Sequence, residues 1–392
     1  MTDDGLIALL KELVSIPSVN PMLSEDPGIG TEEPMAEHLA ALLEARGFRA
    51  EWHEITSGRP NVVGRLGPER PVRSLLIESH LDTQGIHGMT VPPFDGIVRA
   101  GRLYGRGACD TKGPMAAALW ALTPARLEAL SAAGVQVLYV GAVGEEKGNV
   151  GAEQLVDLGI GADEALVLEP TGHAIVHAHK GTLWYEVEAL GRAAHGSNPE
   201  KGISSIRAMT RVMDAIEQEL DAARAHHGGG LLGPPTVNIG LIRGGSSINI
   251  VPDRCIIEVD RRTVPGEDNA AILSCVRSVL SELRDRGALQ EFNLVPIKEG
   301  TPFETRADTR LVRRLVASCR SNNEPGRTEG ASWYSDAGPF AKTCGEVAVF
   351  GPGSILQAHT ADEYIELDSL QRGADIIGHF LDTLAVEAKG MV

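Results

Sequence analysis

The chain has 392 residues, of which 43% are hydrophobic and 23% are charged, with 45 glycines and 22 prolines. This composition excludes collagen-like, disordered and disulfide-scaffold proteins, and the length favours two domains. The formal net charge of −17 argues against nucleic acid or an anionic membrane surface as a partner.

The cysteines and the first residues bear on the cellular compartment. Five cysteines are widely spaced and form no CxxC pair: Cys109, Cys255, Cys275, Cys319 and Cys344. Neither a disulfide framework nor a thiolate zinc site is therefore expected. No apolar run approaches the roughly 18 residues of a membrane span, and the acidic start "MTDDG" is unlike a signal peptide. We expect a cytoplasmic protein with no membrane partner.

The first half of the chain alternates predicted helices and strands. The segment 31–47 is expected to be a helix, and Thr31 would cap its N-terminus. Glu33 and Pro34 stand in its first turn, and Gly47 follows its end. The same pattern predicts strands at 48–55, 61–66, 73–79, 135–143 and 165–169, and helices at 112–134 and 149–159. Such alternation predicts an α/β fold with a mostly parallel mixed sheet flanked by helices.

The pattern changes near residue 180. Strands are expected at 181–191, 236–245, 254–264 and 292–300, and helices at 204–220 and 270–287. The resulting order, βαββαβ, is that of a ferredoxin-like unit. The first of these helices carries one apolar stripe: Ile206, Met209, Met213, Ile216 and Leu220. Residues 224–235 form the most loop-like segment.

After residue 300 the alternation of predicted helices and strands seen in the first half of the chain resumes. A helix is expected at 309–321, a strand at 346–351 and a closing helix at 369–387. The simplest domain organisation is therefore a discontinuous first domain, formed by 1–180 and 300–392, with a compact domain inserted at 181–299.

Side chains that can bind metal follow several predicted strands. They are His80, the adjacent Glu145 and Glu146, Glu169 and, after the loop "GPGSILQA", His359. A further acid, Asp110, lies in the glycine-rich loop "YGRGACDTKGPM" just before a predicted helix. Each residue alone has an ordinary structural explanation, such as a helix cap or a solvated strand end. In an α/β sheet, however, ligands bind beyond the carboxyl ends of the strands, so we expect these side chains to converge.

The types of these side chains indicate the kind of metal site. Two histidines with several carboxylates and no thiolate suit zinc, cobalt or manganese. The acids are too many for one tetrahedral zinc, whereas two ions about 3.5–4 Å apart that share a carboxylate would use them. Asp82, two residues after His80, is a candidate to orient that imidazole. Of the pair Glu145 and Glu146, one would bind metal and the other would act as general base toward water.

Five motifs, in this order and spacing, resemble the di-zinc amidohydrolase family: "SHLDT", "GRGACDTKG", "GEEKGN", "LEPTG" and "QAHTADEYIE". That family includes aminoacylases, glutamate carboxypeptidases, acetylornithine deacetylase and succinyl-diaminopimelate desuccinylase. The resemblance covers nearly the whole chain. It implies a catalytic metal-binding domain at 1–180 and 300–392, and an inserted lid and dimerisation domain at 181–299.

The resemblance also implies roles for the metal-binding residues. Asp110 would bridge two divalent ions, zinc in the first place. The other ligands would be His80 and Glu169 for one ion and Glu146 and His359 for the other. Glu145 would be the general base and Asp82 the orienting acid. A cis peptide is implied between Asp110 and Thr111.

Two segments of the inserted domain carry the same resemblance. "GRAAHGSNPEKG" is similar to the family's histidine loop, which implies a homodimer in which His195 reaches the partner's active site and stabilises the oxyanion. "GGSSINIVPDRCIIEVDRR" is similar to its substrate-binding stretch, with Asn249 and Arg262 at matching positions. Arg262 would grip the substrate carboxylate with its planar fork. The alternative for this arginine is a surface ion pair.

The predicted function is hydrolysis of the amide bond of an N-acyl-L-amino acid or short peptide. Within the family, "GPGSILQAHTADEYIE" and "WYSDAGPF" favour an enzyme similar to acetylornithine deacetylase. Desuccinylase, dipeptidase and carboxypeptidase activities stay open. A non-catalytic amino-acid-binding protein is less favoured, because such a protein should have lost a ligand or the base. A redox enzyme ranks last, since no GxGxxG follows a predicted strand.

Overall fold

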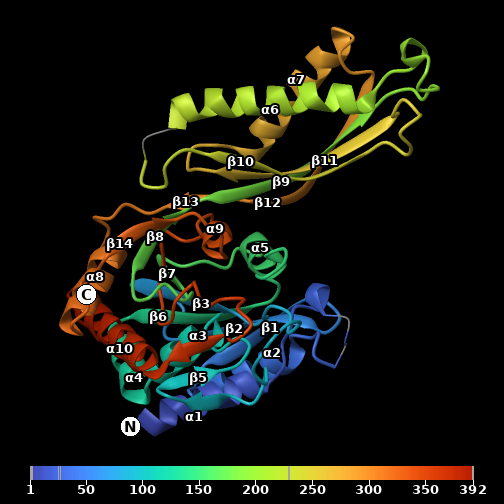
Figure 1. The fold of residues 1–392 in the computed structure, drawn as a ribbon. Coiled ribbons are helices and arrows are strands. Elements are labelled where there is room, and N and C mark those ends of the chain that lie inside the picture. The colour runs from blue at the N-terminus through green and yellow to red at the C-terminus, as the bar shows by residue number, and fades with distance from the viewer. Residues whose placement is uncertain (1–2, 25, 27, 228–229, 391–392) are drawn as a thin grey trace. The chain divides into compact units, whose positions relative to one another are not determined.

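The computed structural model describes residues 3–24, 26, 28–227 and 230–390. The chain forms two compact units (Figure 1). The first comprises Met1–His177, Thr305–Glu329 and Ser335–Val392, and the second comprises Ala178–Glu304 and Gly330–Tyr334. The assignment of a catalytic role to one and a lid role to the other stays a prediction. Within the described ranges, no helix is both long and apolar enough to cross a membrane.

The first unit is built on a mixed sheet. Its strands follow the order β1-β2-β6-β3-β7-β15-β8, and β14 also pairs with β8. Strand β13 pairs with Ala178 and His179 at the end of β8, and these residues belong to the second unit. Their bounds are β1 (Arg49–Thr56), β2 (Arg59–Leu66), β3 (Arg73–His80), β6 (Val135–Ala142), β7 (Glu164–Val167), β8 (Ile175–His179), β13 (Phe303–Glu304), β14 (Thr328–Ala331) and β15 (Glu346–Val349). The central strands β6, β3, β7 and β15 are parallel, whereas β1, β2 and β8 pair antiparallel. The predicted α/β fold is confirmed.

Helices pack on this sheet and bury its apolar side chains. They are α1 (Asp3–Ser15), α2 (Glu33–Glu44), α3 (Lys112–Ala121), α4 (Pro124–Ala132), α5 (Val150–Asp157), α8 (Arg310–Ser321), α9 (Ala337–Phe340) and α10 (Leu367–Lys389), with a 3₁₀ turn η1 (Pro21–Leu23). A small antiparallel sheet adds β4 (Ile97–Arg99), β5 (Arg102–Tyr104) and β16 (Tyr364–Glu366). One core joins the apolar sides of α1, α2, α3 and α10 to the strands, with Ile77, Leu119 and Phe380 fully buried.

Two predicted helix boundaries were wrong. The segment 112–134 contains two helices, because Pro124 lacks an N–H and the Thr123 side chain accepts a hydrogen bond from Arg126 N to start α4. The N-cap of α2 is Glu32, not Thr31, and its carboxylate pairs with Arg59 at 2.6 Å instead of capping the helix. The Thr31 hydroxyl still accepts a hydrogen bond from the backbone N–H of Glu33 at 3.4 Å, so the cap lies one residue later than predicted.

The second unit has the predicted ferredoxin-like fold. Its elements are β9 (Gly181–Leu190), α6 (Ser205–His227), β10 (Thr236–Gly244), β11 (Arg254–Thr263), α7 (Asn269–Asp285) and β12 (Glu291–Gly300), with a 3₁₀ turn η2 (Pro199–Lys201). The antiparallel sheet has the order β10-β11-β9-β12, and β9 and β11 alternate buried and half-buried residues. Both helices bury an apolar stripe against one face of this sheet.

Two details of α6 differ from expectation. Ile206 is 41% exposed, whereas Ala208 and Val212 are buried, so the buried stripe begins later than predicted. The helix also continues to His227, into the segment 224–235 that the sequence marked as a loop. The two glycines that follow His227 lie outside the described residues.

Candidate metal centre

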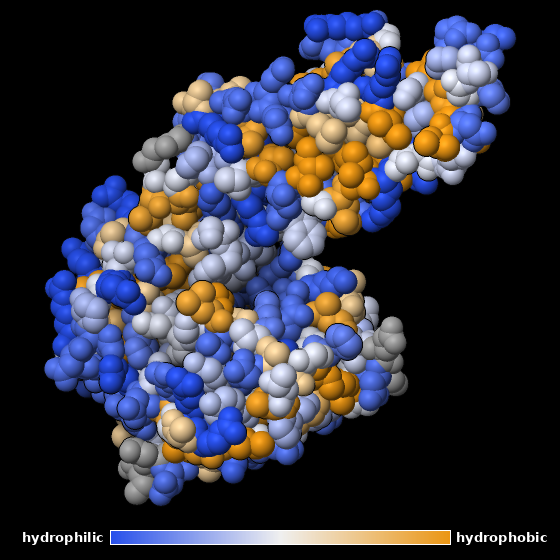
Figure 2. Space-filling view, in the orientation of Figure 1, coloured by the Kyte–Doolittle hydropathy of each residue, from blue (hydrophilic) through white to orange (hydrophobic). Residues whose placement is uncertain are grey.

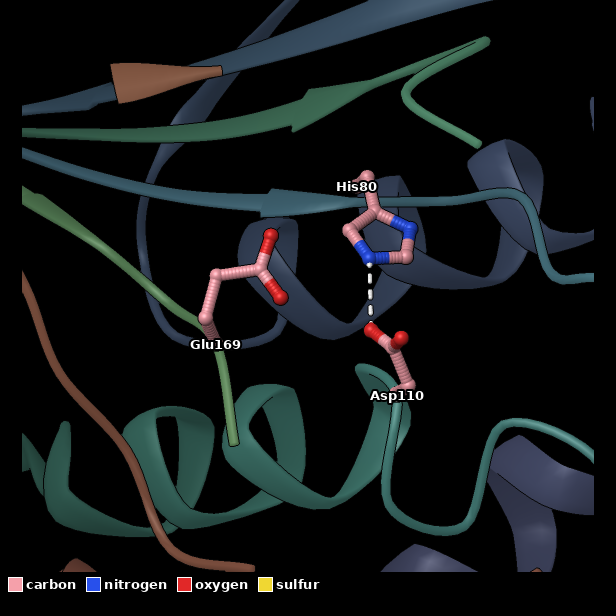
Figure 3. A group of neighbouring side chains, drawn as sticks. All are labelled: His80, Asp110 and Glu169. Carbon is pink, nitrogen blue, oxygen red and sulfur yellow. Dashed lines mark hydrogen bonds and ion pairs between the residues drawn. The ribbon is translucent and has the colours of Figure 1, made fainter. Parts of the chain in front are cut away.

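The predicted metal ligands converge at one edge of the first unit's sheet. Strand β3 ends at His80, and Glu146 and Glu169 lie in the segments that follow β6 and β7. Asp110 stands just before α3, and His359 lies in the loop after β15 with a φ of 64°. Because the central strands are parallel, these segments meet beyond the strands' carboxyl ends. Figure 3 shows His80, Asp110 and Glu169 pointing toward one another.

The ligand atoms form two groups that share Asp110. One group is His80, Asp110 and Glu169, the other is Asp110, Glu146 and His359, and the ligand atoms of each lie within 4.8 Å of one another. Asp110 Oδ1 lies 3.2 Å from His80 Nε2, and Asp110 Oδ2 lies 3.2 Å from His359 Nε2. Glu146 Oε2 is 3.0 Å from His359 Nε2. A carboxylate that offers one oxygen to each histidine has the geometry of a bridging ligand.

The electrostatics of the centre fit bound cations. Desolvation and neighbouring carboxylates raise the pKa of Glu169 and of Glu145 well above the usual value. Glu146 Oε1 is buried and has no hydrogen-bond partner among the described residues. Hydrogen bonds to Asp110 and Glu146 raise the pKa of His359 to about 10. A ligating imidazole must be neutral, so cation binding would release this proton and metal affinity would rise with pH.

The backbone beside Asp110 adopts an unusual geometry. The peptide bond between Asp110 and Thr111 is cis, as the resemblance implied. The Thr111 hydroxyl donates a hydrogen bond to the carbonyl oxygen of Leu168, at 2.9 Å, next to Glu169. The loop that carries Asp110 is thereby tied to the segment that carries Glu169.

Asp82 holds the segment that carries the two glutamates. Its Oδ1 accepts hydrogen bonds from the backbone N–H groups of Gly144 (3.0 Å) and Glu145 (3.1 Å), and its Oδ2 accepts from that of Glu146 (3.0 Å). Its carboxylate oxygen Oδ1 lies 3.6 Å from His80 Nδ1, whereas its own carbonyl oxygen lies at 2.9 Å. Asp82 therefore contacts the imidazole and also fixes the backbone of the turn that carries Glu145 and Glu146 after β6.

Two residues that support these contacts were not found by sequence reasoning. Asn20, in the segment between α1 and α2, donates its side-chain N–H to Asp82 Oδ2 at 2.8 Å. Glu363 is fully buried, and its Oε1 accepts from the backbone N–H groups of Cys109 (2.9 Å) and Asp110 (3.0 Å). Its Oε2 accepts from Arg106 at 2.6 Å. The motif "QAHTADEYIE", which contains Glu363, was the only sequence signal for it.

Glu363→Gln is expected to weaken metal binding, with a loss of affinity of roughly 10–100-fold. The glutamine amide can still accept from the two backbone N–H groups, but it leaves the Arg106 cation without its buried counter-charge and shifts the loop that carries Asp110. Metal titration monitored by calorimetry measures the effect. Glu366→Gln is the matched control, because Glu366 pairs with Arg102 on the exposed end of the same segment. Equal metal affinity in both variants would contradict the prediction.

Of the three site residues predicted in the second unit, His195 and Asn249 lie on neighbouring segments, whereas Arg262 lies apart from them. Gly196 N donates to the Asn249 carbonyl oxygen at 2.7 Å, so the segments that carry His195 and Asn249 lie side by side. Arg262 lies toward the other end of β11, where it forms an ion pair with Asp260 at 3.0 Å. The sequence had left this surface ion pair as the alternative for Arg262. Any role of the three residues in substrate binding or catalysis stays a prediction.

Comparison with known proteins agrees with this arrangement. A family model described as peptidase family M20/M25/M40 matches residues 76–383. An acetylornithine deacetylase from Myxococcus xanthus is 33% identical over 377 residues, which cover 94% of each chain. A probable succinyl-diaminopimelate desuccinylase from Staphylococcus aureus (strain MSSA476) is 27% identical over 410 residues, with 94% of this chain and 95% of that protein covered.

Solved structures share the fold. A tripeptidase from Staphylococcus aureus superposes with a TM-score of 0.79 at 22% identity, covering 98% of this chain and 99% of that chain. A metallo-carboxypeptidase from Sulfolobus solfataricus gives a TM-score of 0.78 at 21% identity, covering 97% and 99% of the two chains. The matching family model and the relative from Myxococcus xanthus show that the chain belongs to peptidase family M20/M25/M40. With two groups of metal ligands that share Asp110, it is a di-metal hydrolase.

Proposed function

We propose that this hydrolase cleaves the amide bond of an N-acyl-L-amino acid, as an enzyme similar to acetylornithine deacetylase. The observation that carries the proposal is the pairing of two ligand groups through Asp110, with an additional carboxylate, Glu145, beside them that belongs to neither group. The relative from Myxococcus xanthus, which covers almost the whole chain, supports the acetylornithine deacetylase assignment.

Two divalent ions would be held by the two groups described above. Zinc suits these donors best, and cobalt and manganese suit them as well. When bound, the ions would polarise the substrate carbonyl and lower the pKa of the attacking water. His80, Asp110 and Glu169 would hold one ion, and Asp110 would hold the second together with Glu146 and His359.

Glu145 would act as the general base. Its backbone N–H donates a hydrogen bond to Asp82 Oδ1 at 3.1 Å, which fixes the backbone that carries its side chain. Desolvation raises its pKa, and the nearby carboxylates of Asp336, Glu146 and Asp110 act in the same direction. A more basic carboxylate takes a proton from water more readily near neutral pH. It would then pass that proton to the leaving amine.

His195, Asn249 and Arg262 would contact the substrate. We propose that His195 is donated to the active site of the partner subunit in a homodimer, where its imidazole would donate a hydrogen bond to the oxyanion. The exposed edge strand β10 supports dimerisation through the second unit, because Leu241 is 49% exposed and Ile242 is 56% exposed. Figure 2 shows apolar side chains gathered over the sheet of this unit.

Subunit complementation tests the donation of His195. Mixed dimers of Glu145→Gln and His195→Ala subunits are expected to regain activity, because one of the two sites then has both intact residues. Each parent alone should be nearly inactive, with the His195 interaction worth about 2.7–4 kcal/mol. Activity is measured after subunit exchange and compared with that of each parent. A monomer with full activity, or mixed dimers with none, would show that the donation is wrong.

A substrate screen tests the proposed function. Acetyl-, succinyl- and formyl-amino acids and dipeptides would be assayed with zinc, cobalt or manganese. Hydrolysis of N-acetyl-L-ornithine with a kcat/KM well above that of the other substrates is the expected result. A preference for a succinyl substrate would favour a desuccinylase, in line with the relative from Staphylococcus aureus. Binding without turnover of any substrate would indicate an amino-acid-binding protein.

A further inference from the structure

Asn149 lies between the proposed general base and a buried acid from a distant part of the chain. Its side-chain N–H₂ group donates to Asp336 Oδ1 at 2.9 Å and to Glu145 Oε1 at 3.4 Å. Asn149 is 1% exposed and stands directly before α5, with a φ of 55°. Asparagine tolerates this left-handed conformation better than most residues. Its amide carries two donor hydrogens, so it can bind both carboxylates at once.

Asp336 fixes the position of this asparagine. It directly precedes α9, is 1% exposed, and lies close to Glu78 of β3, where desolvation and then the charge of Asp336 raise the pKa of Glu78 well above its usual value. Strand β3 is the strand that ends at His80. Asp336 is thus held against the central sheet, and Asn149 is held by Asp336. The position of the amide relative to Glu145 is therefore set by the core and not by a flexible loop.

A neutral amide at this place has a defined chemical effect on Glu145. A donor on Oε1 restrains rotation of the carboxylate and leaves Oε2 free to face the reacting water. A lysine or arginine in the same place would restrain the group too, but its charge would lower the basicity of the carboxylate. The 3.4 Å separation suits a contact that tightens as the reaction proceeds, since such hydrogen bonds are often long before substrate binds.

We propose that Asn149, held by Asp336, is a positioning residue that orients the Glu145 carboxylate for proton transfer. This inference rests on the proposed role of Glu145 as general base. Asn149 itself is not expected to touch the substrate or the metals. It acts only through Glu145, which distinguishes it from a residue that supports the fold.

Asn149→Gly removes the amide without straining the backbone, because glycine adopts a positive φ freely. We expect kcat to fall roughly 10–100-fold, with KM and metal content unchanged. Asn323→Gly is the matched control, since Asn323 is an exposed asparagine with a φ of 61° near the end of α8. It should keep the kcat of the natural sequence. Wild-type kcat in Asn149→Gly, or a loss of metal in that variant, would overturn the proposal.

A second variant separates the loss of the amide donor from the loss of side-chain volume in Asn149→Gly. Asn149→Asp keeps the shape of the side chain and tolerates the same φ, but it replaces the donor by an acceptor that repels Glu145. Its kcat should fall at least as far as that of Asn149→Gly. If Asn149→Asp retains wild-type kcat, the amide donor is unimportant and the proposal is wrong.

A double-mutant cycle separates positioning from a general structural role. In the Glu145→Gln background, Asn149→Gly should cause little further loss of kcat, because its effect passes through the missing base. An equal fold-loss in both backgrounds would overturn the proposal, since Asn149 would then act independently of Glu145. Wild-type kcat in Glu145→Gln alone would instead refute the role of Glu145, so the two failures are distinguishable.

Discussion

Asp110→Ala is expected to remove both divalent ions and to abolish activity. Among the described residues, Asp110 alone belongs to both ligand groups, and each of its oxygens lies 3.2 Å from a different histidine. Removing it leaves two ligands in each group and takes away the carboxylate that would lie between the ions. Four-coordinate metal sites in enzymes normally keep three protein ligands, so neither site should retain its ion.

The metal content after dialysis against a chelator measures this effect. His80→Ala and His359→Ala serve as matched comparisons, because each histidine belongs to one group only. Each of these variants should lose one ion preferentially, whereas Asp110→Ala should lose two. Full metal content in Asp110→Ala, or the loss of only one ion, would refute the bridging assignment.

Glu145→Gln is expected to lower kcat by roughly 10²–10⁴-fold while metal binding is kept. Glutamine preserves the size of the side chain and can still accept the hydrogen bond from Asn149, but it cannot take a proton from water. Because Glu145 is in neither ligand group, its loss should leave the metal content unchanged.

Glu146→Gln is the matched variant for this prediction. The two glutamates are adjacent, and Asp82 binds the backbone N–H of each, so a general disturbance of the turn should affect both variants alike. Glu146→Gln is expected to lose metal, since Glu146 Oε2 lies 3.0 Å from His359 in the second ligand group. If Glu145→Gln loses metal and Glu146→Gln retains it, the two roles are exchanged.

The sequence by itself determined the fold class and the candidate ligand positions. Strand and helix periodicities predicted the parallel sheet, and residues at the ends of parallel strands must meet at one edge. His80, the pair Glu145 and Glu146, and Glu169 could therefore be grouped from the sequence, and the family resemblance then implied that Glu146 is the ligand of the pair. The βαββαβ order likewise predicted the ferredoxin-like unit, because side-chain periodicity is a local property of the chain.

The tertiary structure alone decided which side chains support that centre. Asn20 reaches Asp82 across 62 positions, Asn149 reaches Asp336 across 187, and Glu363 reaches Asp110 across 253. Hydrogen bonds between such distant residues leave no periodic signal, since they depend on how the loops pack after the sheet has formed. The same is true of Glu32, whose charge is paired with that of Arg59 across 27 positions. The sequence offers each charged group several partners, and only folding brings one of them within hydrogen-bond distance.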